Sequence, residues 1–158
     1  MDFKIARKNM VENQIRANKV TSLNVINAFL DVPREKFVPD ALQEISYVDE
    51  DIQLSRNRFM MKPMILARLF QSLNLKGNEN ILHVGSNLGY GSAILSRMCS
   101  SVISLESDKK LFETSIHTFS NMGFDNVVPL HGSMENGVEK EAPFDIIFIE
   151  GSIETEPK

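Results

Sequence analysis

From residue 79 onward, the sequence predicts an α/β fold in which a parallel sheet lies between layers of helices. Apolar runs of strand length alternate there with segments of helical spacing, in the order β-α-β-α-β-β. These runs are apolar throughout, which is typical of parallel strands that are covered on both faces. A glycine-bearing turn at residues 85–91 joins the first strand to a helix. Together these observations predict a three-layer α/β/α arrangement.

The residues before this region are predicted to be mostly helical. Apolar side chains fall near one face of the first helix, and Thr21 or Ser22 can cap the second helix, which Pro33 ends. A third helix can start at Pro63 and end near Gly77, which suits a C-cap. The predicted elements are helices at residues 3–20, 23–30 and 64–75, a connector at 34–39, a short helical turn at 41–47 and a solvated acidic loop at 49–51.

The same sequence patterns predict the strands and helices of the α/β region. Because Pro129 removes a ladder hydrogen bond, its strand is expected to be short or to lie at an edge of the sheet. The strongly apolar run at residues 144–149 is expected to be a central strand. The predicted elements are strands at residues 81–84, 101–106, 126–130 and 144–149, helices at 90–99 and 109–122, and a loop at 131–143.

The composition excludes several classes of protein. The chain has 158 residues, of which 42% are hydrophobic and 24% charged, enough for one domain with a sizeable core. A net charge of −4 without a basic stripe argues against a nucleic-acid partner. No apolar run approaches the length of a membrane span, and the three histidines lack metal-ligand spacing. Cys99 is the only cysteine, which excludes a disulfide within the chain and fits the cytoplasm.

The glycine turn is the strongest candidate for a binding site. A strand, a glycine turn and a helix N-terminus direct amide N–H groups and the helix dipole toward a ligand. Glu106 ends the next strand about 20 residues after Gly85, the spacing of an acid that accepts hydrogen bonds from ribose hydroxyls. The alternatives are a tight turn without a ligand and a surface acid at a strand end.

The spacing of the glycines narrows the class of ligand. The pattern G-x-x-x-G-x-G at residues 85–91 lacks the second glycine that lets a pyrophosphate approach, and no Gly-Lys-Ser/Thr follows it. A nucleoside without a pyrophosphate fits better, and a nicotinamide-dependent oxidoreductase is disfavoured. Asn87 stands where a glycine is usual, and asparagine tolerates a left-handed backbone better than most residues.

Several segments resemble the protein-L-isoaspartate O-methyltransferase family, within the class I S-adenosylmethionine-dependent methyltransferases. The most family-specific match is Val-Pro-Arg-Glu-Lys-Phe-Val-Pro at residues 32–39. Residues 83–90 resemble the family's cofactor motif, Glu-Ile-Gly-Thr-Gly-Ser-Gly-Tyr, and residues 102–106 resemble the strand whose acid holds the cofactor ribose. Further matches are residues 10–17, Tyr47 with Asp49, residues 126–127 and residues 144–147.

This resemblance implies a Rossmann-like enzyme that transfers a methyl group from S-adenosylmethionine to the side-chain carboxylate of an L-isoaspartyl residue in a damaged protein. Because the nucleophile is already a carboxylate, positioning and desolvation would do most of the catalysis. His83 takes the place of the motif's usual acid, and Ser133 that of an aspartate expected near the adenine. The residues implied to bind the cofactor are His83, Gly85, Ser86, Asn87, Gly89, Tyr90, Glu106 and Ser133.

The segment implied to bind the substrate departs from the family pattern. The family reads Gly-Gln-Thr-Ile-Ser-Gln-Pro where this chain, aligned on its proline, has residues 57–63. Phe59 and Met61 occupy the Thr and Ser positions, so the hydroxyls that would bind the substrate are replaced by apolar groups. Each unmet polar group costs on the order of 1–3 kcal/mol, so impaired catalysis is expected. Ser55 is a nearby hydroxyl outside the matching positions.

The matches suggest an N-terminal helical, substrate-side extension at residues 1–60 and an S-adenosylmethionine-binding domain at residues 61–158, in one compact unit. The family continues with further helices and strands, so the sheet is expected to be incomplete at the C-terminus and to leave an edge of its fourth strand uncovered. Either a further part of a longer protein or self-association would cover that edge. The expected partner is a protein or peptide substrate rather than nucleic acid or a membrane. The alternative to an enzyme is a catalytically degenerate family member that acts as a binding or regulatory module.

Overall fold

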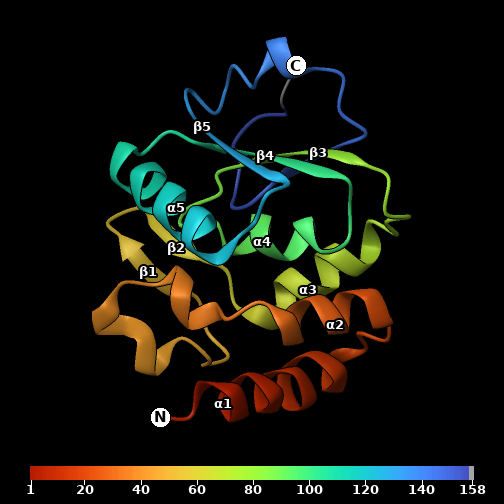
Figure 1. Ribbon diagram of the computed structural model, residues 1–158, viewed down its shortest axis with the longest axis vertical. Coiled ribbons are helices and arrows are strands. Elements are labelled where there is room, and N and C mark those ends of the chain that lie inside the picture. The colour runs from red at the N-terminus through yellow and green to blue at the C-terminus, as the bar shows by residue number, and fades with distance from the viewer. Residues whose placement is uncertain (157–158) are drawn as a thin grey trace. The chain divides into compact units, whose positions relative to one another are not determined.

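A computed structural model describes residues 1–156 and divides the chain into two compact units (Figure 1). The first unit ends at Lys76 and the second begins at Gly77. Helix α3 (Pro63–Ser72) therefore belongs with the N-terminal unit, whereas the functional boundary suggested by the sequence lies before this helix, at residues 60/61. No helix of the described chain is long and apolar enough to cross a membrane.

The first helical segment of the N-terminal unit changes its geometry twice. Helix α1 (Phe3–Met10) begins at Asp2, whose Oδ1 accepts the amide of Lys4 at 3.0 Å. The segment continues as a π-helical turn, η1 (Val11–Ile15), and a 3₁₀ turn, η2 (Arg16–Asn18). The predicted element at residues 3–20 is thus helical but not one regular α-helix. A pattern read at 3.6 residues per turn does not register the wider π-turn.

The next elements agree with the sequence reading. Helix α2 (Leu23–Asp31) begins after Ser22, whose Oγ accepts the amide of Val25 at 3.5 Å, and it ends before Pro33. Two 3₁₀ turns follow, η3 (Arg34–Phe37) and η4 (Asp40–Ile45).

A short antiparallel hairpin, β1 (Ile52–Ser55) and β2 (Arg58–Met60), is an element that the sequence analysis missed. Its strands have four and three residues, which is too short for an alternating pattern to stand out.

Helix α3 begins at Pro63 as predicted, but it ends earlier than expected. Its C-cap is Leu73, and Asn74 adopts the left-handed conformation with φ of 50°. Asparagine can end a helix in this way, so Gly77 is not the residue that ends α3.

The second unit is built on a four-stranded, fully parallel sheet. Its strand order is β5-β4-β3-β6, so the two edges are β5 and β6. Two helices connect the first three strands, and Figure 1 shows both on the same side of the sheet. The elements are β3 (Asn80–Val84), α4 (Tyr90–Ser96), β4 (Ser101–Glu106), α5 (Lys109–Met122), β5 (Val127–His131), η5 (Glu139–Glu141) and β6 (Ile146–Ile149).

Segments of different kinds cover the two faces of this sheet. Leu82, Val84 and Leu105 form a buried cluster against which Met134 and Val138 pack, both from the chain between β5 and β6. The other face carries α4 and α5, and the parallel strands with these connecting helices form a Rossmann-like α/β sheet.

The position of β6 corrects one prediction. The run at residues 144–149 was expected to be a central strand, but among the described residues β6 begins at Ile146 and pairs only with β3. Ile147 is 60% exposed. Apolar composition predicts a strand without fixing its place in the sheet. The expectation from Pro129 is confirmed, since β5 is the opposite edge strand.

Candidate functional site

The candidate site lies at the carboxyl ends of β3 and β4. After β3 the chain turns through Gly85, Ser86 and Asn87, and the amides of Gly85 and Ser86 donate to the carbonyl of Leu105 at 3.0 and 3.2 Å. Asn87 adopts φ of +56°, a left-handed conformation that asparagine tolerates, so the turn exists without the usual glycine there. The sharp turn expected between β3 and α4 is therefore present, and β4 holds it in place.

Glu106 joins this turn to the start of the next helix. Its Oε2 accepts the amide of Asn87 at 2.7 Å, and its Oε1 accepts the amide of Asp108, the N-cap of α5, at 2.9 Å. The side chain is buried, since Glu106 is 1% exposed. Charge-assisted bonds of this kind are about twice as strong as neutral ones. The carboxylate thus fixes the backbone of the turn to the end of β4.

A second polar cluster lies beneath the turn. His83 is fully buried, with Nδ1 2.7 Å from Oγ of Ser92 and Nε2 3.0 Å from Oε2 of Glu150. Ser92 lies within hydrogen-bond distance of Ser104, at 2.9 Å between the two Oγ atoms. The ring of His83 also packs on Phe148, with the ring centroids 5.3 Å apart. Three strands and α4 therefore contribute to one buried cluster.

The glycines of the turn make room for the protein's own side chains. A Cβ at Gly89, where φ is +96°, would lie 2.3 Å from Cζ of Phe119. A Cβ at Gly91 would lie 2.7 Å from Oε2 of Glu150 and 2.8 Å from Cε1 of His83. Real Cβ contacts essentially never come so close, so a larger residue at either position would force these side chains to shift, whether or not a ligand is bound.

The structure brings most of the predicted cofactor residues to one edge of the sheet. Besides the turn and Glu106, Tyr90 is the first residue of α4 and is 2% exposed. Ser133 is exposed in the loop after β5, directly after Gly132, whose amide donates to the carbonyl of Glu106 at 3.1 Å. The ring of His83 is directed to Ser92 and Glu150.

The residues matched to the family's substrate segment belong to the N-terminal unit. Ser55 is the last residue of β1 and is exposed. Phe59 lies in β2 with 49% of its surface exposed, and Met61 follows β2, half-buried. The amide of Lys62 donates to Oδ1 of Asp51 at 2.8 Å, so one member of the predicted acidic loop holds the end of the hairpin.

Sequence reasoning missed Glu150 and Ser92. A signal for Glu150 existed, because this acid directly follows an apolar strand, as Glu106 ends β4. The carboxyl ends of parallel strands lie at the same edge of the sheet, so both acids are expected near the same turn. No pattern distinguishes the buried Ser92 from an ordinary surface serine. Among residues 1–156 no cluster of three His, Cys, Asp or Glu side chains could hold a metal ion.

The family model described as protein-L-isoaspartate(D-aspartate) O-methyltransferase matches residues 5–158. A protein-L-isoaspartate O-methyltransferase 2 of Anaeromyxobacter sp. (strain Fw109-5) is 33% identical over 151 residues, covering 96% of this chain and 62% of the relative. A protein-L-isoaspartate O-methyltransferase of Desulfosudis oleivorans is 34% identical over 143 residues, covering 90% and 65%. The chain therefore spans less than two thirds of the length of these relatives.

Solved structures give the same result for the fold. A protein-L-isoaspartate O-methyltransferase structure superposes with a TM-score of 0.79 and 25% identity, over 90% of this chain and 47% of that one. A Plasmodium falciparum structure named for the same enzyme, in complex with S-adenosyl-L-homocysteine, gives a TM-score of 0.78 and 24% identity over 99% of this chain and 77% of that one.

Proposed function

Because the chain belongs to the protein-L-isoaspartate(D-aspartate) O-methyltransferase family, we propose that it methylates the side-chain carboxylate of L-isoaspartyl residues in damaged proteins, with S-adenosylmethionine as donor. The observation that carries this proposal is the contact between Glu106 and the turn after β3. It brings an acid and a left-handed turn together at 2.7 Å, at the sheet edge where open α/β folds bind nucleosides.

The residues of the second unit fit the proposed donor. Glu106 stands where an acid accepts bonds from the two hydroxyls of a ribose, and Ser133 offers a hydroxyl on the loop after the neighbouring strand. The carboxylate of Glu150 lies near the start of α4, with Oε2 2.7 Å from the Cβ position of Gly91, and it contacts His83. The negative charge of Glu106 favours a cationic ligand over an anionic one. S-adenosylmethionine, when bound, supplies an electrophilic methyl group on a sulfonium.

The substrate needs little chemical activation from this chain. An isoaspartyl carboxylate is ionised at neutral pH, so the protein's part is to hold it in line and to exclude water. We assign this part to the hairpin β1–β2 and the residues after it. Phe59 and Met61 offer no hydroxyl to the substrate there, so weak peptide affinity is expected. The cytoplasm, expected from the single cysteine, is the proposed location.

Calorimetric titration with S-adenosylhomocysteine tests the donor site. The unaltered chain is expected to bind, and Glu106→Gln is expected to weaken binding about tenfold or more, because a charged acceptor at the turn is lost. Glu113→Gln is the matched control, since it removes a carboxylate on the exposed face of α5. No heat and no thermal shift at millimolar ligand would refute the proposed cofactor.

A second candidate function is a binding or regulatory module without catalysis. The exposed apolar ring of Phe59 at a position matched to threonine favours it. Methyl transfer to an isoaspartyl peptide separates the two candidates, because only the enzyme turns over. The double variant Phe59→Thr, Met61→Ser is expected to raise turnover if the missing hydroxyls limit it. Ligand binding without turnover in either protein would favour the module.

A further inference from the structure

Arg34 is a buried cation that the proposed function has not used. Its side chain is fully buried. Nε donates to the carbonyl of Ser46 at 2.7 Å, and one terminal nitrogen donates to the carbonyl of Met61 at 3.1 Å. The first contact lies just after η4, and the second lies just after β2. One planar guanidinium therefore joins two segments that are separate in the sequence.

A second contact holds the same peptide group whose carbonyl accepts the hydrogen bond from Arg34. The carbonyl of Met61 and the amide N–H of Lys62 belong to one planar peptide unit. The carbonyl accepts from Arg34, while the N–H donates to Oδ1 of Asp51 at 2.8 Å. Cross-strand pairing of Ile52 with Met60 holds the preceding residue. The peptide plane after β2 is thus held at both its acceptor and its donor.

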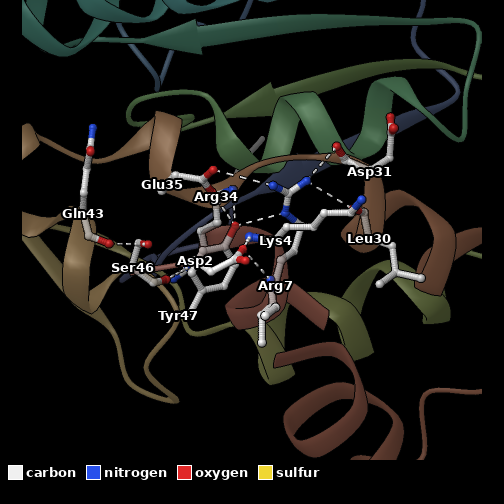
Figure 2. A network of polar contacts seen from close by, with 11 residues as sticks. Asp2, Lys4, Arg7, Leu30, Asp31, Arg34, Glu35, Gln43, Ser46 and Tyr47 are labelled. Atoms are coloured by element: carbon white, nitrogen blue, oxygen red, sulfur yellow. Dashed lines mark hydrogen bonds and ion pairs between the residues drawn. The ribbon is translucent and has the colours of Figure 1, made fainter. Parts of the chain in front are cut away.

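A network of polar contacts around Tyr47 holds the backbone of Arg34 (Figure 2). Its backbone amide donates to the hydroxyl of Tyr47 at 3.1 Å, and that hydroxyl donates to the carboxylate of Glu35. Nε of Arg7 also donates to the hydroxyl at 3.1 Å, and Nε2 of Gln14 donates to the carbonyl of Tyr47 at 2.8 Å. Burial, followed by the bond to Glu35, raises the pKa of Tyr47, so the hydroxyl keeps its proton and its donor role.

We propose that Arg34 is a positioning residue that sets the conformation of the segment after β2 for peptide binding, with Asp51 acting on the other side of the same peptide group. The inference rests on the proposed function, because it takes the hairpin and Met61 as the part that meets the peptide substrate. The inference also gives a role to the buried side chain of Arg34. The planar guanidinium of arginine can donate to two carbonyls at fixed angles, whereas the compact ammonium of lysine cannot.

The first test compares Arg34→Lys with Arg16→Lys. The second substitution is the matched control, because Arg16 lies in the same unit with an exposed side chain paired to Glu12 at 3.2 Å. Arg34→Lys is expected to raise the KM for an isoaspartyl peptide about tenfold, the loss of one charge-assisted hydrogen bond, with a smaller change in kcat. The affinity for S-adenosylhomocysteine should stay within about twofold, since the proposed donor residues all lie in the other unit.

Asp51→Ala provides a second variant in case Arg34→Lys does not fold. Asp51 is exposed, so its removal leaves the core intact, and Glu50→Ala in the same exposed loop is its control. Asp51→Ala should also raise the KM for the peptide, and hydrogen exchange at the Lys62 amide should become faster in both variants. An unchanged KM in the folded variants would overturn the proposal. An equal loss of peptide affinity and cofactor affinity would also overturn it, because that result indicates a general structural role.

The experiment also separates this proposal from the proposed function. If the unaltered chain neither binds nor methylates the peptide, the proposed function fails. The rate of hydrogen exchange at the Lys62 amide then tests by itself whether Arg34 and Asp51 position this peptide group. Faster exchange in Arg34→Lys and Asp51→Ala supports the proposal, and unchanged exchange overturns it.

Discussion

At the scale of single residues, the buried cluster beneath the turn forms one chain of close polar contacts, of which two are hydrogen bonds and the third joins a ring nitrogen to a carboxylate. Ser104, Ser92, His83 and Glu150 follow one another at 2.9, 2.7 and 3.0 Å. Each hydroxyl can both donate and accept, so Ser92 can bond to Ser104 and to His83 at the same time. Removing either end of this chain leaves a buried polar group without its partner.

A double-mutant cycle on His83 and Glu150 tests this coupling. His83→Gln and Glu150→Gln are each expected to lower the free energy of unfolding by roughly 1–3 kcal/mol, because a buried partner is lost. The double variant should cost less than the sum, with a coupling energy of about 0.5–3 kcal/mol, measured by urea unfolding. The same cycle on the exposed pair of Lys109 and Glu113, at 3.8 Å, should give no more than about 0.5 kcal/mol. Additive effects at His83 and Glu150 would mean that the two side chains do not act together.

At the scale of elements, the turn between β3 and α4 depends on Gly89 for two separable reasons. Its φ of +96° strains any residue with a Cβ, and its Cβ position collides with the ring of Phe119. Gly123, the C-cap of α5, has φ of +70° but nothing within 4 Å of its Cβ position. The second glycine therefore isolates the cost of backbone strain alone.

Alanine at these two glycines should have different costs. Gly123→Ala is expected to lower the free energy of unfolding by about 1–2 kcal/mol, the cost of a left-handed residue with a Cβ. Gly89→Ala should cost clearly more, because the clash with Phe119 adds to the same strain. In a Phe119→Ala background the cost of Gly89→Ala should fall to that of Gly123→Ala, as measured by urea unfolding. Equal costs at the two glycines in the unaltered chain would contradict the clash.

Elements with strong local signals were predictable from the sequence. The strand that ends at Glu106 and the helix at residues 109–122 were predicted with the bounds of β4 and α5, and in the structure Asp108 and Gly123 cap this helix. The hairpin at residues 52–60 was not predicted, since its pairing depends on tertiary contacts rather than on a local pattern.

The site was predictable where it follows a rule of topology and unpredictable where it depends on side-chain packing. The meeting of Glu106 with the turn follows from the parallel order of β3 and β4. The cluster around His83 also requires a serine of α4 to reach the same ring as the acid after β6, and no sequence spacing encodes the approach of that serine. The contacts of Arg34 and Asp51 with one peptide group likewise depend on side-chain packing and could not be predicted from the sequence.

At the scale of the whole molecule, each unit holds one group whose buried neutral form resists ionisation at high pH. In the second unit, burial and the charge of Glu79 raise the pKa of Cys99 to about 12. In the first unit, burial and the hydrogen bond to Glu35 raise the pKa of Tyr47 above its ordinary value of 10.0. Both groups bind a proton more tightly in the folded chain than in the unfolded chain.

This difference predicts that alkaline pH destabilises the fold. As the pH rises above about 9, the ordinary value for a thiol, the unfolded chain loses a proton that folded Cys99 retains, and above about 10 the same holds for Tyr47. Stability is therefore fully present below these values and falls toward the raised folded pKa. Urea unfolding at pH 7 and pH 10.5 under reducing conditions should show this fall, and Cys99→Ala and Tyr47→Phe should each make it smaller. Lysines titrate in the same range in all three proteins, so only the differences between them report on the two buried groups. The same fall in the unaltered chain and in both variants would show that these groups do not link folding to pH.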